Sequence, residues 1–226
     1  MLNPDREKKD SMPAQTPESA HYHLEEGHLC IDFINTAYIQ VDEQAPFGYQ
    51  QLDEKLTDLS ALAEWARDAG VLTATESELL KQANPAGVDS FRELREALRR
   101  LIRAHNADQE IPERALATIN RAIPPVLSHT RIGKDDDGFR VQIDELCGDA
   151  SDPDHVLDHL TWAIGQSVIS LLTDPKELDM IRECPAGDCG YLFRDTSHGR
   201  RRWCSMKSCG NRAKVQRFRE KQKIEA

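Results

Sequence analysis

Four cysteines near the C-terminal end constrain the fold of this chain more than any other feature. They are Cys184, Cys189, Cys204 and Cys209, two pairs of C-x4-C spacing with 14 residues between the pairs. Zinc prefers four ligands in a tetrahedron, and two tight turns that each offer two thiolates complete that arrangement. Four thiolates leave no position for water or substrate, so the pattern predicts one structural Zn²⁺ per chain rather than a catalytic ion.

Length and composition define the class of protein in which this site occurs. The chain has 226 residues, enough for one sizeable domain and a small one. No apolar run approaches the ~20 residues of a membrane span, and the polar, proline-dotted N-terminus is unlike a signal peptide. We therefore expect a cytoplasmic protein with no membrane partner. Disulfides are rare in that compartment, so the isolated Cys30 and Cys147 are expected to be ordinary buried side chains.

Charge is distributed unevenly along the chain. Between Arg182 and Lys223 there are 12 Lys or Arg residues and 4 Asp or Glu residues, a net charge of +8 in a chain of net charge −10. The remaining residues therefore carry −18. A four-thiolate zinc centre is itself formally about −2, so some of these cations offset local charge. An acidic body joined to a basic module still predicts a polyanionic partner for the module, most commonly nucleic acid.

The chain divides into three predicted parts. Residues 1–20 combine charges with three prolines and lack apolar periodicity, which predicts a disordered tail. Residues 21–177 carry several amphipathic helical patterns and one hairpin pattern, residues 126–132 and 139–143 on either side of a Gly- and Asp-rich turn. Residues 178–226 form the small metal module. The predicted fold class is α+β, mainly helical.

Helical periodicity begins early in the middle part. Residues 28–35 fit either a short strand or a turn of helix, since so short a run does not separate the two. From Leu52 onward apolar residues recur at helical spacing until Gly70, which predicts one helix across that span. Thr73 and Glu76 match a capping box, the start of another helix.

Longer helices follow in the second half of this part. One is predicted over residues 88–106, with an arginine- and glutamate-rich face that we expect to be solvated. The next begins near residue 112 and is expected to stop at Pro124 and Pro125. A further helix starts at Asp152 and Pro153. Its inward-facing residues are predicted to be Val156, Leu160, Ile164, Val168 and Leu171.

The order of elements in the metal module indicates its architecture. Residues 178–182 suit a short strand, and two β-prone runs flank a turn at residues 197–199 between the cysteine pairs. Knuckle, hairpin, knuckle and helix is the order of a treble-clef zinc finger, in which the last two thiolates lie at a helix N-terminus. Trp203 is expected to fill the hairpin core. Val215 and Phe218 are expected to pack the final helix on the hairpin.

Cations gather in three clusters in this module. The first lies on the predicted hairpin and the other two form rows along the final helix: Arg200, Arg201 and Arg202; Arg212, Arg219 and Lys223; Lys214, Arg217 and Lys221. Three clusters in so small a module predict contact with nucleic acid. The alternative is a solvated surface that offsets the thiolate charge.

Histidines offer other metal-binding patterns that the sequence supports less well. His198 could replace one cysteine, although the four cysteines already form symmetric knuckles. His155 and His159 are four residues apart on a predicted helix, but no third ligand lies near them in the sequence. A surface or half-buried histidine pair is the simpler interpretation.

Two stretches resemble known families. The run from Gly190 through Arg201-Arg202-Trp203-Cys204 to Cys209-Gly210-Asn211-Arg212 is similar to the CGNR zinc finger, which is named for its last four residues. Residues 27–36 and 62–70 resemble the ABATE domain, which precedes this finger in bacterial stress-induced transcription regulators. The resemblance implies an N-terminal α+β domain that senses a ligand and a DNA-binding C-terminal finger with the four cysteines as zinc ligands.

These patterns favour a DNA-binding transcription regulator, and no nucleophile, base or phosphate loop indicates an enzyme. Two rivals stay open: a redox or zinc sensor that uses the four cysteines as a switch, and an RNA-binding module with the same basic surface. A single finger buries little surface on DNA, so we expect a homodimer formed through residues 21–177. The alternative role for that domain is to bind a small-molecule effector. Asp32, Asn35 and Thr36 are candidates for its polar contacts, although a hydrogen-bonded core role explains them better.

Overall fold

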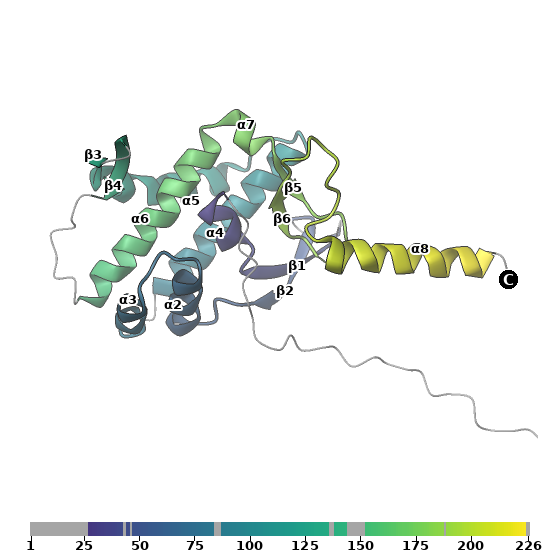
Figure 1. Cartoon of the computed structure of the whole chain (residues 1–226), viewed down its shortest axis with the longest axis horizontal. Helices are drawn as coiled ribbons and strands as arrows, with labels where there is room; N and C mark the ends of the chain where they lie inside the picture. Colours follow the sequence, from purple (N-terminus) through teal and green to yellow (C-terminus); the bar gives the residue numbers. More distant parts are fainter. Residues whose placement is uncertain are drawn as a thin grey trace, which may run out of the picture.

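The computed structural model describes residues 27–42, 44–45, 47–83, 87–135, 138–143, 152–187 and 189–224. The predicted disordered tail, residues 1–20, lies outside this part of the chain, and so does Cys147. The described residues form a helical body with three separate two-stranded antiparallel sheets, and a C-terminal helix extends away from the body (Figure 1). The predicted α+β, mainly helical fold class is confirmed.

The elements occur in the following order. The first are α1 (Leu29–Ile34), β1 (Ala37–Val41), β2 (Tyr49–Glu54), α2 (Leu59–Asp68), α3 (Ala74–Leu80) and α4 (Gly87–Asn106). They are followed by α5 (Glu113–Ser128), β3 (Thr130–Asp135), β4 (Gly138–Ile143), α6 (Pro153–Leu172) and α7 (Pro175–Leu178). The cysteine-rich segment contributes β5 (Ile181–Glu183), β6 (Leu192–Arg194), the π-helical turn η1 (Met206–Gly210) and α8 (Asn211–Ile224).

The ambiguous run near residue 30 forms helix α1 inside the body. Cys30, Ile31, Phe33 and Ile34 are all buried, so apolar side chains cover more than one side of this helix. Such a helix is stable only where neighbours surround it. Helices α4 and α6 pack against it, and the ring of Phe33 lies 5.5 Å from that of Trp65, centroid to centroid. The long helices therefore assemble around α1.

Helix α6 has the predicted start and inward face. The Asp152 side chain accepts a hydrogen bond from the Asp154 backbone N–H at 3.0 Å, and Pro153 occupies the first turn, where a missing N–H costs little. All the predicted inward-facing residues are buried: Val156, Leu160, Ile164, Val168 and Leu171. This stripe packs against α1, α3 and α5.

The helix predicted to begin at Leu52 begins seven residues later. Asp58 caps α2 by accepting a hydrogen bond from the Ala61 N–H at 2.9 Å, and Leu52 belongs instead to β2. The register passes from Tyr38 opposite Asp53 to Ile39 opposite Gln51, so Leu52 is the extra residue of a bulge and is 53% exposed. Leu52 therefore matched the helical period of the following residues by chance and is not part of the helix.

The two prolines do not end α5, contrary to expectation. Pro124 and Pro125 lie inside the helix, which continues to Ser128. Val126 is buried at 1% exposure against α6, where a Cβ on Gly165 would lie 2.4 Å from its Cγ2 atom. Close packing of Val126 on a glycine therefore offsets the two lost helical hydrogen bonds. The predicted hairpin is present as β3 and β4, but it starts at Thr130.

Helix α3 starts with the predicted capping box. The Glu76 N–H donates to the Thr73 hydroxyl, and the Glu76 carboxylate accepts from the Thr73 N–H at 2.7 Å. Replacing Thr73 by alanine is expected to lower the free energy of unfolding by about 1 kcal/mol, since one N–H of the first turn loses its acceptor. Urea denaturation measures this effect. Thr57→Ala, at an exposed threonine that caps no helix, should change stability much less; equal losses would contradict the capping role.

The polar face of α4 is not solvated as expected. Arg95 and Arg99 are each 1% exposed. Arg95, Arg99 and Arg103 recur every four residues along the helix. Arg95 donates to both carboxylate oxygens of Glu54. These arginines face β1, β2 and the cysteine-rich segment, so they join the body to the metal module. Among the described helices, none has the length and apolar composition that a bilayer crossing requires.

Candidate metal centre and basic surface

The structure brings the four predicted cysteine ligands together. The sulfur atoms of Cys184, Cys189, Cys204 and Cys209 all lie within 4.8 Å of one another, and this is the only such cluster that the described residues contain. The Sγ atom of Cys204 lies 3.6 Å from that of Cys189 and 3.6 Å from that of Cys209. Tetrahedral Zn–S bonds of ~2.3 Å place sulfurs about 3.8 Å apart, so the cluster fits a four-thiolate zinc ion.

The first knuckle joins the strands of a short hairpin. Strands β5 and β6 pair antiparallel, with Glu183 opposite Leu192, and the turn between them carries Cys184 and Cys189. The Cys184 N–H donates to the Tyr191 carbonyl at 2.8 Å. The strand predicted over residues 178–182 is thus displaced to residues 181–183, because α7, capped by Asp174, occupies residues 175–178.

The second knuckle is built around one π-helical turn. In η1 the Gly210 N–H donates to the Ser205 carbonyl at 3.0 Å, a bond across five residues. A π-turn is wider than an α-turn. Cys204 directly precedes Ser205, the cap of this turn, and Cys209 lies within it. The two cysteine pairs thus share one spacing but occupy different turns, and α8 continues directly from η1.

Each residue after Cys209 has a local role. A Cβ on Gly210 would lie 2.7 Å from the Met206 sulfur and 3.3 Å from a Trp203 ring carbon, so only glycine fits without a shift. The Asn211 amide donates to the Lys207 carbonyl at 3.2 Å. The Arg212 guanidinium donates to the Cys209 sulfur at 3.1 Å. Arg212, one of the predicted nucleic-acid contacts, therefore lies against a metal ligand and supports its negative charge.

Crowding of the four sulfurs perturbs their ionisation. Hydrogen bonds with Cys189 and Cys204 lower the pKa of the Cys184 thiol to about 2. The hydrogen bond with Cys184 raises the pKa of Cys189 and raises that of Cys204 to about 12, because a thiol that donates to a neighbouring sulfur holds its proton. Of these three sulfurs, only that of Cys184 is favoured as a thiolate. A divalent cation stabilises all four, which is the chemistry that Zn²⁺ supplies.

The first knuckle is attached to the body by buried polar contacts. The Asn35 side chain donates to the Leu192 carbonyl at 2.8 Å and accepts from the Leu192 N–H at 3.0 Å. The Arg99 guanidinium donates to the carbonyl of Gly190 at 3.0 Å, and Arg103 forms an ion pair with Glu183. Ile181 and Leu192 belong to the hydrophobic core of the body. The β5–β6 hairpin is therefore continuous with the body in its packing.

Residues 195–203 form an irregular loop, contrary to the predicted second β-prone run. Asp195 accepts hydrogen bonds from the backbone N–H groups of Ser197 and Gly199 at 2.8 and 2.7 Å. Arg201 donates to the carbonyls of Arg194 and Cys204, and its guanidinium lies 4.6 Å from the centre of the Phe193 ring. The predicted contact Arg201 thus holds this loop on β6. Side-chain bonds replace the strand pairing that the pattern had suggested.

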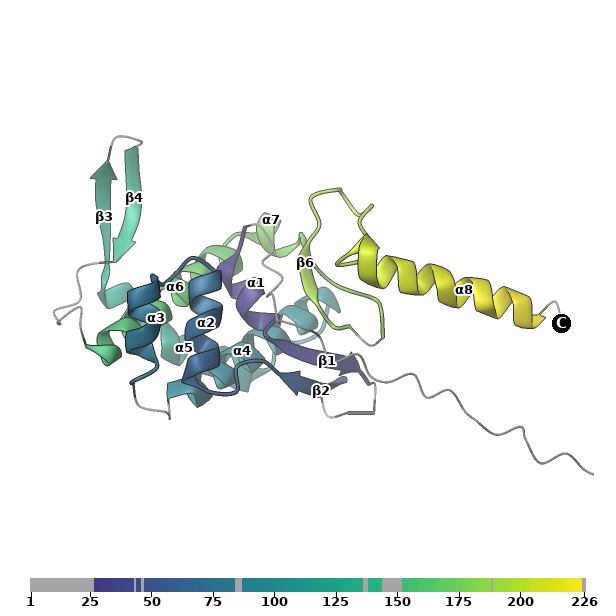
Figure 2. The ribbon, with the colours of Figure 1, turned by 60° about the horizontal axis from the view of Figure 1, so that its bottom comes forward.

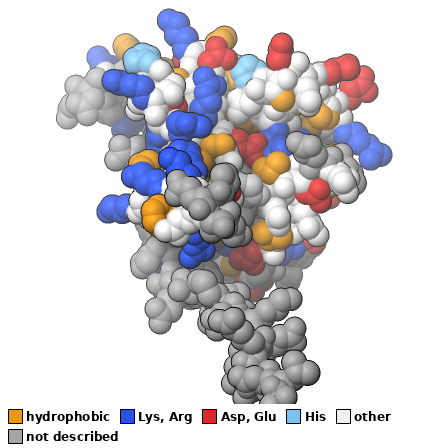
Figure 3. Space-filling model, turned by 90° about the vertical axis from the view of Figure 1, so that its right-hand side faces the viewer, with side chains coloured by type: hydrophobic (Ala, Val, Ile, Leu, Met, Phe, Trp, Pro, Cys, Tyr) orange, Lys and Arg blue, Asp and Glu red, His pale blue; other side chains and the backbone are white. Residues whose placement is uncertain are grey.

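The other predicted cations lie on the outer surface of the module. Arg200, Arg202, Lys214, Arg217, Arg219 and Lys221 are exposed, whereas the side chain of Lys223 lies outside the described part. Seen along α8, Lys and Arg side chains gather mainly on one side of the molecule and acidic side chains mainly on the other (Figure 3). These exposed cations therefore form a positive region on and beside α8, which we call the basic surface.

Val215 and Phe218 do not pack on the hairpin. They are 50% and 62% exposed, because α8 leaves η1 in a direction away from the body and contacts little beyond η1 (Figure 2). The prediction of a packed helical face is therefore wrong. Trp203 is half-buried and packs against the small core around the cysteines, as expected.

The remaining candidates have structural surroundings. Thr36 donates to the Phe33 carbonyl at 2.7 Å and accepts from Arg95, and Asn35 binds Leu192 as described. Asp32 is 8% exposed. His159 forms an ion pair with Glu76 at 3.6 Å. His198 lies at a turn with φ of 56° and takes no part in the metal cluster.

Sequence reasoning missed the residues that attach the metal module to the body. Arg99 and Arg103 share this role with Asn35, and neither arginine had been singled out. A signal was present in α4, where all five basic residues other than histidine are arginines and three of them recur every four positions. Arginine is favoured over lysine where several carbonyl or carboxylate groups must be bound at once.

Comparison with protein families agrees with this division of the chain. Residues 27–175 match the ABATE model, described as "Putative stress-induced transcription regulator". Residues 180–222 match the CGNR zinc finger model. Among curated proteins, none matches the chain.

Proposed function

The chain belongs to the ABATE family and carries a CGNR zinc finger, and on this premise we propose that it is a transcription regulator that binds DNA through the basic surface around α8. A structural zinc ion, one per chain, holds the two knuckles and thereby fixes the start of α8. The ABATE domain supplies the response to a signal. With zinc bound, the four thiolates would leave no position for a substrate, so we assign the chain to regulators and not to enzymes.

The single observation that carries this proposal is the isolation of α8. Its 14 residues include Lys214, Arg217, Arg219 and Lys221, and these four have no hydrogen-bond or ion-pair partner among the described residues. At ~1.5 Å per residue the helix is about 21 Å long. The major groove of DNA, about 12 Å wide, admits such a helix, and exposed Phe218 could contact thymine methyl groups there.

Arg200 and Arg202 extend this surface beyond the helix. They line a cavity of about 400 Å³ next to Trp203 and Met206. DNA-binding proteins commonly contact bases with a helix in the groove and contact the phosphate backbone with neighbouring residues. The arginine loop is placed for the second kind of contact. Arg201 and Arg212, which are used inside the finger, are expected to contribute less.

A single finger of this size reads few base pairs, so we propose that the protein acts in the cytoplasm as a homodimer on two half-sites. Residues 21–177 would form the dimer contact. Light scattering across micromolar concentrations without DNA measures this state, and a strict monomer would contradict it.

Charge reversal on α8 tests the DNA-binding proposal. In full-length, zinc-loaded protein, Lys214→Glu with Arg217→Glu is expected to weaken binding to duplex DNA at least about tenfold, because two phosphate contacts become repulsive. Fluorescence anisotropy measures the affinity. Arg67→Glu with Lys81→Glu changes the net charge equally in the body and should leave affinity nearly unchanged.

Two outcomes would contradict the proposal. Equal weakening by both double variants would mean that binding follows net charge and not the basic surface. Tighter binding to RNA than to duplex DNA in direct competition would assign the surface to RNA.

A further inference from the structure

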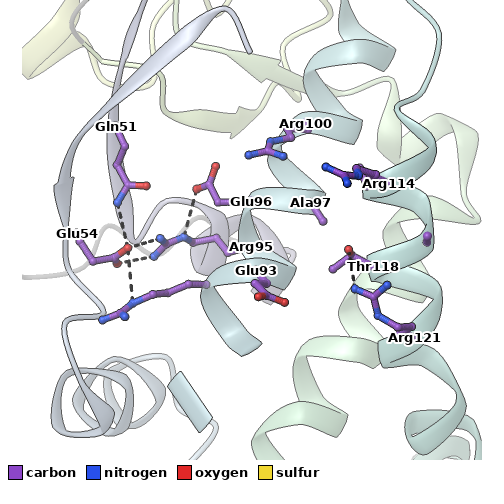
Figure 4. Close-up of a pocket in the computed structure, with 13 residues that line it drawn as sticks. Gln51, Glu54, Glu93, Arg95, Glu96, Ala97, Arg100, Arg114, Thr118 and Arg121 are labelled. Atoms are coloured by element: carbon purple, nitrogen blue, oxygen red, sulfur yellow. Dashed lines mark hydrogen bonds and ion pairs between the residues drawn. The ribbon is translucent and has the colours of Figure 1, made fainter. Parts of the chain in front are cut away.

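A cavity of about 890 Å³ lies in the ABATE domain, between β2, α4 and α5. Its volume falls within the range of about 300–1,000 Å³ that small-molecule sites occupy. Five arginines and three glutamates are among the residues that line it, from β2 and from both helices. Figure 4 shows Arg100 on α4 and Arg114, Thr118 and Arg121 on α5 along the space between the two helices.

Two of the five arginines are already engaged within the protein. Arg95 donates hydrogen bonds to both carboxylate oxygens of Glu54, so the charge of this glutamate is already paired. Arg92 donates to the carbonyls of Leu56 and Thr57 at 2.6 Å each and to Asp89 at 2.7 Å. These two side chains line the cavity but are not available to a ligand.

The other three arginines retain unused donors. Arg114 has no hydrogen-bond or ion-pair partner among the described residues, and Arg121 donates only to the Thr118 hydroxyl, at 3.1 Å. The Arg100 guanidinium is stacked 3.6 Å from the centre of the Phe47 ring, and its buried Nε atom lacks a partner in the described part of the chain. A buried, unpartnered charged donor costs free energy unless an acceptor arrives.

We propose that this cavity binds a small organic anion with two or more negative charges, held by Arg100, Arg114 and Arg121. Guanidinium groups bind phosphate and carboxylate oxygens in pairs, so three of them from two helices suit a phosphorylated or polycarboxylate metabolite. Glu93 also lines the cavity, and its carboxylate would accept hydrogen bonds from hydroxyl or amino groups on the same molecule. Glu96 is already engaged, because it accepts a hydrogen bond from the Tyr49 hydroxyl at 2.6 Å.

Helix α4 connects this cavity to the zinc finger. Glu93, Glu96 and Arg100 line the cavity, while Arg99 and Arg103 on the same helix bind Gly190 and Glu183 of the β5–β6 hairpin. An anion bound between α4 and α5 would therefore contact the same helix that holds the finger hairpin. Binding of the anion itself does not depend on the proposed DNA-binding function, so it is measured without DNA.

Isothermal titration of the full-length, zinc-loaded protein with pyrophosphate, and separately with citrate, tests the site at physiological ionic strength. At least one of the two anions is expected to bind, and which one binds distinguishes a phosphate ligand from a carboxylate ligand. Arg114→Gln with Arg121→Gln should weaken that binding about tenfold or more, because two charge-assisted contacts are lost. Both positions are exposed, so the fold should persist, as circular dichroism can verify.

Arg67→Gln with Lys81→Gln removes the same charge elsewhere in the body and should leave the affinity unchanged. Protection of Arg114 from phenylglyoxal by the bound anion, mapped by peptide mass spectrometry, separates this cavity from the basic surface of the finger. Absence of binding by both anions, or equal affinity in the Arg114/Arg121 variant, would overturn the proposal.

Discussion

Replacing Cys209 by serine is expected to abolish stoichiometric zinc binding and to unfold the second knuckle together with α8. A structural zinc site supplies on the order of 10 kcal/mol, and three thiolates leave the tetrahedron open. Helix α8 packs on η1 and on little else, and an isolated helix of 14 residues is marginal in water. The β5–β6 hairpin should stay in place, because Asn35 and Arg99 hold it on the body.

Metal analysis and far-ultraviolet circular dichroism measure the two parts of this prediction, zinc content and loss of about one helix. Cys30→Ser is the matched control, since Cys30 is buried outside the cluster and a serine hydroxyl can also bond the Ser167 carbonyl that its thiol contacts. That variant should retain one zinc per chain. A Cys209→Ser protein with full zinc and an intact α8 would contradict the assignment of the metal site.

Replacing Arg99 by methionine is expected to lower the free energy of unfolding by about 3 kcal/mol or more. The guanidinium donates to the carbonyls of Ile34, Ala37 and Gly190, at 2.6, 3.1 and 3.0 Å, and all of these bonds are buried. Methionine fills much of the volume but donates nothing, so three buried acceptors lose a donor at about 1–3 kcal/mol each. Burial lowers the pKa of Arg99, yet the side chain remains charged at neutral pH.

Urea denaturation measures this loss, with Arg67→Met as control at an exposed arginine of α2. The control should shift stability by no more than about 0.5 kcal/mol. If Arg99→Met lowers the free energy of unfolding as little as the control does, the contact between α4 and the finger hairpin is not stabilising. The inferred connection between body and finger through α4 would then be wrong.

The sequence predicted the metal centre well because ligand chemistry restricts residue type and spacing together. Four cysteines in two equal pairs leave few alternatives, and the structure brings all four sulfurs within 4.8 Å. Long helices with strong periodicity were also predictable. α4 and α6 match their expected spans, since each buries a continuous apolar stripe.

Features that depend on distant partners were not predictable in the same way. Arg99 resembles any charged residue on a helix until the carbonyls of Ile34, Ala37 and Gly190 surround it. Leu52 fits a helical period, but the pairing of β2 with β1 leaves it as the extra, unpaired residue of a bulge.

Two further errors concern tertiary packing at the ends of helices. The apolar pair Val215 and Phe218 suggested a packed face, whereas the direction in which α8 leaves η1 exposes both. Pro124 and Pro125 indicated a helix end, which the packing of Val126 against Gly165 overrides. Local patterns thus identified most elements, and long-range contacts decided where they end and what they touch.

The salt dependence of DNA binding tests the central claim most directly. Full-length, zinc-loaded protein is titrated onto duplex DNA over a range of salt concentrations, and log affinity is plotted against log salt. The plot has a slope of roughly −0.9 for each phosphate that the protein neutralises. The slope of the Lys214→Glu, Arg217→Glu variant should therefore be about 1.8 less steep than that of the wild type. An identical slope in wild type and variant, or no salt-dependent binding at all, would show that the basic surface around α8 is not a DNA-binding surface.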